Sequence, residues 1–291
     1  EQFIIVNAPG NGVNNYGTQI RLSDDRREVY AIMGLWKTDE KGIPVFPMEQ
    51  YFSLLVHEFN HSFINHLVDK YRELFEQSGK KMFETVGTMM RNQAYGQWEI
   101  MIKESLVRAA VIKYMKDHDF SSTDIANETL AQLSRGFFWT EDLVTELERY
   151  AQQRASFATL ESYMPQMAKA FEQYAQNIEQ YKASFDAKRP KIVSIAEFSN
   201  NDQNVDPGTK TITVNFDRPL LGKGYSIGFG QKGTAAYPKI DSINYSSDNT
   251  AVIIKVQLEP RREYEMVFMG LAFKSTQGIP MENYTVGFST F

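Results

Sequence analysis

The chain has 291 residues, more than one ordinary domain contains, so two domains are expected. It has no cysteine, which excludes a disulfide framework, a zinc–thiolate site and thiol catalysis. Its net charge of -5, without a long run of lysine and arginine, argues against nucleic acid as the main partner. Hydrophobic residues make up 42% of the chain, enough for sizeable cores, but no stretch approaches about 18 consecutive apolar residues, so no transmembrane segment is expected.

The first 47 residues are expected to be rich in β-strands. An apolar run at 3–6 ends in the turn-forming segment 7–12. Residues 19–22 alternate between polar and apolar, which predicts a strand, and residues 29–36 predict a second, more apolar strand. A strand at the edge of a sheet can pair with an extended peptide through backbone hydrogen bonds, and 29–36 is the candidate for that role. An ordinary internal strand is an equal alternative, because sequence does not show which strand lies at an edge.

The next segment carries the H-E-x-x-H motif at His57, Glu58 and His61. Residues 48–68 contain no proline or glycine, and their apolar residues recur at three-to-four-residue spacing, which predicts a helix. On a helix the two histidines lie about 40° apart and one turn along, so both can bind one metal ion. Glu58 points to a neighbouring face, where it can deprotonate a metal-bound water. The alternative is two core histidines bonded to the backbone, with Glu58 in a salt bridge.

A catalytic zinc usually has a third protein ligand, and the remaining histidines do not fit that role. His66 misses the spacing of the three-histidine, one-helix motif by one residue and would face away from the metal. His118 lies between two aspartates in a polar helix end, which indicates a surface position.

The better candidate for the third ligand is a glutamate on the helix predicted over 97–116. Glu104 lies on an apolar stripe of this helix, where an unpaired carboxylate would be costly and a metal would offset the cost. Glu99 lies on a charged stripe and is expected to pair with Lys103. The alternative for Glu104 is a buried ion pair with Arg108, and both interactions can coexist.

From residue 67 to 188 the chain is expected to be mostly helical. The predicted helices cover residues 67–77, 81–93, 97–116, a segment capped by Ser122 or Thr123, and 143–186 with a break near Pro165.

The composition changes near residue 189, and short alternating strands follow, separated by clusters of Asn, Asp, Gly and Pro. About a hundred residues of this pattern predict a small β-sandwich, with the domain boundary between residues 189 and 190. The predicted strands cover residues 212–216, 252–258, 264–268 and 284–288.

Three segments, 42–46, 57–65 and 104–109, resemble a gluzincin-type zinc metallopeptidase, and more narrowly a family of bacterial, exported zincin-like proteins of unassigned function. The resemblance covers roughly residues 13–120. It implies a Zn²⁺ cofactor held by His57, His61 and Glu104, with Glu58 as general base in the hydrolysis of a peptide or protein substrate. Tyr95, Tyr114 and Tyr163 remain open as donors to the oxyanion.

The C-terminal segments 190–193, 211–216 and 286–290 resemble bacterial Ig-like domains of cell-envelope proteins. The expected fold class is therefore α+β, with a zincin-like domain over 1–189 and an Ig-like β-sandwich over 190–291. The chain starts at Glu1 without a basic-then-apolar leader, which fits a cytoplasmic protein or a mature exported one, and the β-domain favours export and attachment to the cell surface.

Two other functions remain open at this point. One is a zinc hydrolase of a non-protein amide, and the other is a non-catalytic zincin-fold binding or scaffold protein of the cell envelope. The sequence does not indicate an oligomeric state.

Overall fold

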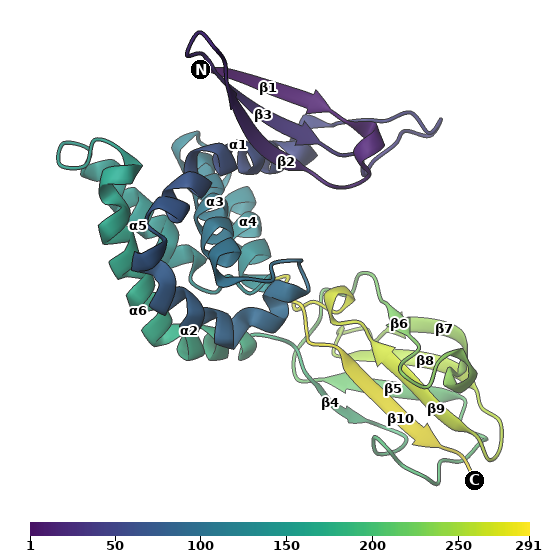
Figure 1. Cartoon of the computed structure of the whole chain (residues 1–291). Helices are drawn as coiled ribbons and strands as arrows, with labels where there is room; N and C mark the ends of the chain where they lie inside the picture. Colours follow the sequence, from purple (N-terminus) through teal and green to yellow (C-terminus); the bar gives the residue numbers. More distant parts are fainter. The chain divides into compact units, whose positions relative to one another are not determined.

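The chain forms a mixed α+β structure in the computed structural model, which describes all 291 residues except the side chains of Glu49 and Gln50, and this confirms the expected class (Figure 1). It divides into two compact units, Glu1–Ala183 and Ser184–Phe291. The division lies a few residues before the predicted boundary, because Arg189 is buried in the second unit, where its Nη1 donates to the carbonyl oxygen of Pro280 at 2.8 Å.

The first unit begins with a three-stranded sheet in the order β1-β3-β2. Its strands are β1 (Gln2–Asn7), β2 (Tyr16–Arg21) and β3 (Arg27–Met33), with β1 parallel and β2 antiparallel to β3. The strand proposed as a substrate-binding edge is therefore the central one, because both its neighbours already pair with it. The edge strands of this sheet are β1 and β2.

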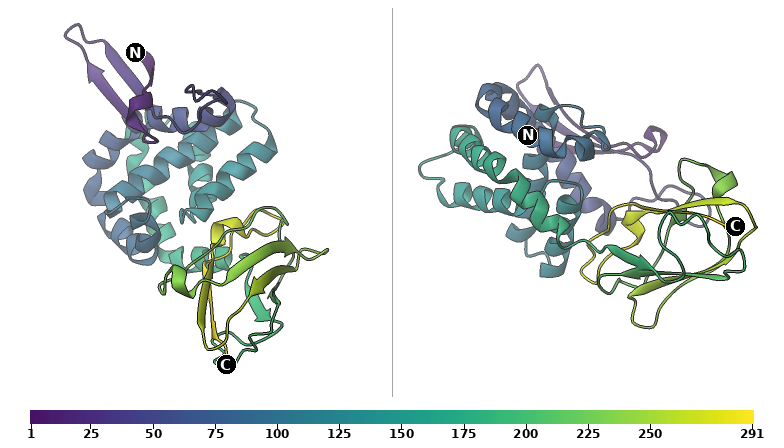
Figure 2. Two further views of the ribbon diagram at one scale, coloured as in Figure 1. Left: turned by 90° about the vertical axis from the view of Figure 1, so that its right-hand side faces the viewer. Right: turned by 90° about the horizontal axis from the view of Figure 1, so that it is seen from below.

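Helices make up the rest of the first unit, and Figure 2 shows their grouping from two further directions. They are α1 (Met48–Lys70), α2 (Arg72–Arg91), α3 (Trp98–Asp117), α4 (Ser122–Ser134), α5 (Thr140–Gln152) and α6 (Leu160–Asp186). Helix α1 packs against β2 and β3 on one side and against α3 on another. None of the described helices has both the length and the apolar character needed to cross a bilayer.

Two predicted helix breaks are wrong. Helix α2 continues through Gly79, where a Cβ atom would lie 2.3 Å from Cε3 of Trp98, so this glycine allows α2 and α3 to approach closely. Helix α6 includes Pro165, and the break falls at 153–159 before it. Pro165 lies in the second turn of α6, where it removes the hydrogen bond that an N–H would give to the carbonyl oxygen of Glu161, but the helix continues through it. The cap of α4 is Ser121, one residue earlier than predicted, and it accepts from the N–H of Asp124 at 3.1 Å.

The second unit contains two sheets, in the orders β4-β5-β8-β7 and β10-β9-β6, and all their pairings are antiparallel. The strands are β4 (Ile192–Ile195), β5 (Thr211–Phe216), β6 (Ile227–Gly228), β7 (Lys239–Tyr245), β8 (Ala251–Gln257), β9 (Glu263–Phe268) and β10 (Tyr284–Ser289). One core joins the sheets: Val214 and Ile254 come from the first, and Met266 and Phe288 from the second. The sequence did not predict β4, β6 and β7, which are short or contain no fully buried residue.

Candidate metal centre

Three side chains from two packed helices converge in the first unit. His57 and His61 come from α1 and Glu104 from α3, and one potential ligand atom of each lies within 4.8 Å of the others. The two Nε2 atoms are 3.2 Å apart, and they lie 3.6 and 3.5 Å from the Glu104 carboxylate oxygens. Around a tetrahedral zinc with bonds of about 2.0–2.1 Å, neighbouring ligand atoms lie about 3.3 Å apart. The donor set therefore fits zinc in both chemistry and spacing.

Both histidines have surroundings that suit metal binding, which requires the neutral imidazole. Burial, and next the charge of Arg108, hold the pKa of His57 well below its usual value. Nδ1 of His61 lies 3.2 Å from Oδ1 of Asn65, and this bond uses Nδ1 as the donor. It leaves the lone pair on Nε2, which faces His57 and Glu104.

Glu104 is only 7% exposed, and it also pairs with Arg108 on the same helix, whose Nη2 donates to Oε2 at 2.9 Å. The ion pair and the approach to the histidines thus occur together, as the sequence allowed. Arg108 is itself buried and donates to Oε1 of Gln132 at 2.8 Å and to the hydroxyl oxygen of Tyr95 at 2.6 Å. The guanidinium is held by three acceptors and in turn fixes the direction of the Glu104 carboxylate.

Glu58 lies beside the three converging groups without joining them. It is 5% exposed and accepts a hydrogen bond from the backbone N–H of Gly17. Burial, followed by the charge of Glu104, raises the pKa of Glu58 to about 7. Strand β2 comes so close here that a Cβ atom on Gly17 would lie 1.8 Å from the carbonyl oxygen of Glu58.

The two remaining histidines do not take part in this cluster. His66 is exposed, and His118 is exposed at the end of α3 with Nδ1 2.9 Å from the carbonyl oxygen of Tyr114. Their positions agree with their exclusion as ligands in the sequence analysis.

The predicted pair between Glu99 and Lys103 is wrong. Glu99 instead accepts from Nη2 of Arg72 at 2.7 Å, and Lys103 pairs with Asp69 at 2.6 Å. Both partners lie on other helices, so a rule based on spacing within one helix could not find them.

The three tyrosines considered as oxyanion donors lie in different places. Tyr95 lines the same cavity as His57 and Glu58. Tyr114 stacks on His118 at 3.8 Å, and the buried Tyr163 donates to Oε1 of Glu146 at 2.6 Å. Only Tyr95, of these three, is within reach of a ligand in that cavity.

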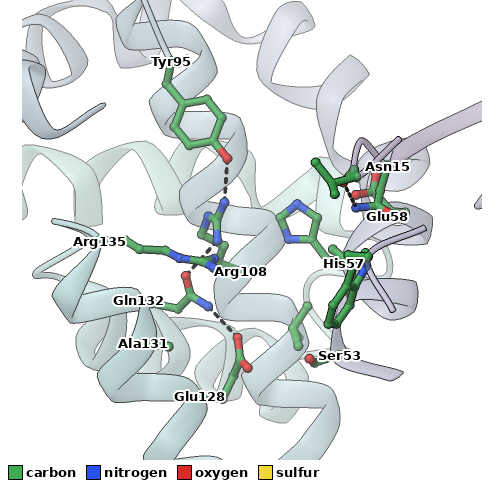
Figure 3. A pocket seen from close by; sticks show the side chains of 14 residues that line it. Asn15, Ser53, His57, Glu58, Tyr95, Arg108, Glu128, Ala131, Gln132 and Arg135 are labelled. Atoms are coloured by element: carbon green, nitrogen blue, oxygen red, sulfur yellow. Dashed lines mark hydrogen bonds between the residues drawn. The ribbon is translucent and has the colours of Figure 1, made fainter. Parts of the chain in front are cut away.

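The cavity beside the metal centre, which we call the cleft, has a volume of about 500 Å³. It is lined by Val13, Asn15, Trp36, Ser53, Leu54, His57, Glu58, Tyr95, Arg108, Val111, Glu128, Ala131, Gln132 and Arg135. Figure 3 shows Arg108 between Tyr95 and Gln132, with Arg135 beside them and with His57 and Glu58 across the cleft. A small peptide segment fits a space of this size.

The family of the chain follows from a match over its first part. A family model described as "Domain of unknown function (DUF4932)" matches residues 1–170, more than half of the chain. The chain belongs to the DUF4932 family. The metal centre and every residue that lines the cleft lie within the DUF4932 segment.

Other comparisons add little to the DUF4932 assignment. A search of curated proteins gave no match. The S-layer protein rSbsC(31-844) is 18% identical, with a TM-score of 0.26, and the match covers 88% of this chain and 35% of that chain. Domains 1-6 of surface layer protein SbsC are 17% identical, with a TM-score of 0.26 and coverage of 80% and 33%. This chain spans about a third of the length of both structures, and TM-scores this low carry no argument about fold or function.

Sequence reasoning missed one wall of the cleft in this DUF4932 protein. Glu128, Gln132 and Arg135 come from α4 or its C-terminal cap, a polar segment that resembles a solvated helix. One signal was present in the sequence: Arg108 on an apolar helix has five N–H donors, which a single glutamate cannot satisfy. That excess predicts further polar partners, without indicating which segment supplies them.

Proposed function

We propose that this protein is a zinc-dependent hydrolase of peptide bonds, with His57, His61 and Glu104 as zinc ligands and Glu58 as general base. The observation that carries the proposal is the convergence of the three donors, next to a second buried carboxylate, Glu58, in the same cleft. A purely structural cluster would have no use for that second carboxylate, which is costly to bury.

Zinc in this position supplies a Lewis acid that polarises a carbonyl group and lowers the pKa of water. Glu58 takes a proton from the attacking water and passes it to the leaving amine, a role that suits a carboxylate whose pKa lies near neutrality. Arg108 holds the Glu104 carboxylate in place, and Asn65 keeps the lone pair of His61 on Nε2. The cleft holds the substrate segment against these groups.

We also propose that the first unit is zincin-like and that the second is Ig-like. For the first, β2 is an edge strand that packs on the H-E-x-x-H helix, and Asn15 just before it lines the cleft. For the second, naming its seven strands A to G in chain order gives the sheets A-B-E-D and G-F-C, the arrangement of constant-type immunoglobulin domains. Such a module suits an exported protein whose catalytic unit is attached to the cell envelope.

The proposal is tested by metal analysis together with peptide hydrolysis. We expect about one zinc per chain, retained in Glu58→Gln while peptide hydrolysis falls by at least about two orders of magnitude. Glu104→Ala should lose zinc, whereas Glu99→Ala, which changes a glutamate on the same helix, should keep it.

Two results would contradict the proposal. A protein that binds no metal is not a zinc hydrolase. A protein that binds zinc but cleaves nothing in a broad peptide library is either a non-catalytic binding protein or a hydrolase of another amide.

A further inference from the structure

The cleft contains a cationic group whose charge is not paired within the protein. Arg135 caps the C-terminus of α4, and its side chain lines the cleft. Among the side chains that the structure describes, none forms a hydrogen bond or an ion pair with its guanidinium group. An arginine in a cavity without a partner has all five of its N–H donors available to a ligand.

The neighbouring arginine differs in this respect. Arg108 donates from its two Nη atoms to Glu104, Tyr95 and Gln132, whereas its buried Nε has no acceptor among the described residues. Gln132 in turn donates to Glu128, and no ion pair joins that carboxylate to Arg135 among the described residues. The wall of the cleft thus has one guanidinium group whose Nη atoms are bound within the protein, and beside it a second guanidinium group without a partner among the described residues.

With a divalent ion bound, the charge around the cleft also favours an anionic ligand. The charged groups around the cleft are three carboxylates, Glu58, Glu104 and Glu128, and two guanidinium groups, Arg108 and Arg135, with a net charge of -1. A divalent ion at the metal centre changes this to +1.

We infer that Arg135 binds a carboxylate of the substrate, so that the cleft selects peptides carrying an acidic group next to the bond that is cleaved. Arginine and carboxylate form paired, parallel hydrogen bonds, which give both affinity and a fixed orientation. The carboxylate comes either from the C-terminus of the peptide or from an aspartate or glutamate side chain. This inference rests on the proposed function for the identity of the ligand as a peptide.

The test measures binding, so that it does not depend on turnover. The Glu58→Gln variant of the 291-residue chain, with and without zinc, is titrated calorimetrically with N-acetylated tetrapeptides of alanine and phenylalanine. One pair differs only in a free or amidated C-terminus, and a second, amidated pair differs only in glutamate or glutamine at one position. The pair that shows the difference identifies the source of the carboxylate.

We expect the acidic member of at least one pair to bind about ten-fold or more tightly than its neutral partner. Adding Arg135→Ala should abolish this difference, and Arg135→Lys should restore part of it. The matched control is Arg91→Ala: Arg91 is also an exposed arginine at the C-terminal end of a helix of this unit, but it does not line the cleft. This control should leave the difference unchanged.

The outcomes separate this inference from the proposed function. Equal binding of acidic and neutral peptides, or a preference that persists in Arg135→Ala, overturns the inference even if the zinc-loaded wild-type protein hydrolyses peptides. A preference that depends on Arg135 upholds the inference even if the protein binds no zinc or cleaves no peptide, which would refute only the proposed function.

Discussion

Single residues around the candidate metal centre favour the neutral form of His57 and fix the tautomer of His61. Burial and Arg108 keep His57 neutral, and Asn65 keeps the proton of His61 on Nδ1. Arg108 and Asn65 are not metal ligands, but they limit the orientations and tautomers that the ligand side chains adopt in the metal-free protein. Their removal therefore weakens metal binding while all three ligands remain in place.

Asn65→Ala tests this effect. We expect its zinc Kd to rise by about ten-fold or more, because the His61 ring loses the bond that fixes its tautomer and orientation. Competition with a chromophoric chelator measures this Kd. Asn60→Ala is the matched control on the same helix, since the Asn60 side-chain nitrogen is buried without a hydrogen-bond partner among the described residues. Equal zinc affinity of wild type and Asn65→Ala would contradict the assigned role.

The site residues also differ in how far sequence alone identifies them. His57, Glu58 and His61 follow from a five-residue pattern on one helix, where a period of 3.6 residues is enough to place side chains together. Glu104 could be proposed because a carboxylate on an apolar stripe requires a partner. Arg135 could not be found in this way, since an arginine at the end of a polar helix looks solvated until the packing of α4 is known.

At the scale of elements, local patterns predicted α1, α3 and the strands β5, β8, β9 and β10 well, whereas contacts distant in sequence determined the strand order of the first sheet and the continuation of α2 through Gly79. The order β1-β3-β2 depends on a parallel pairing between the first and third strands, which no local pattern contains. Gly79 looks like a helix end by propensity, but the close approach of Trp98 makes it an interior position of α2.

Replacing Gly79 with valine tests whether this position needs glycine because Trp98 packs closely against it. We expect Gly79→Val to lower the free energy of unfolding by about 1–3 kcal/mol, because the new side chain overlaps the buried indole of Trp98. Chemical denaturation measures the change. Gly96→Val, where a Cβ atom would meet nothing within 4 Å, should change it by no more than about 0.5 kcal/mol. Similar losses in both variants would show that the Trp98 contact is unimportant.

At the scale of the whole molecule, each of the two units is compact, and the second has a hydrophobic core formed from residues of its own strands and of the loops between them. The amino-acid composition changes near Pro190, but the second unit begins at Ser184, so composition alone did not locate its start. Arg189 contacts Asp186 and the carbonyl oxygen of Pro280. Through these contacts the second unit includes the last residues of α6.

A fragment that covers 184–291 should therefore fold by itself and unfold cooperatively. A fragment that starts at Lys191 should melt at least about 4 °C lower, because it leaves the buried carbonyl of Pro280 without its donor, a loss of about 1 kcal/mol or more in a domain of this size. Thermal unfolding followed by circular dichroism compares the two. Identical melting temperatures would place the start of the unit after Arg189.

The absence of a side chain at Gly17 has a mechanical consequence for the centre. Strand β2 touches the turn of α1 that carries Glu58 and His61, and Ser62 one residue further donates to the carbonyl oxygen of Thr18 at 3.1 Å. The strand cannot move inward without a collision, and it cannot move outward without breaking that bond. The distance between β2 and this turn of α1 is therefore fixed. An extended chain bound alongside β2 would lie at a fixed distance from the carboxylate of Glu58.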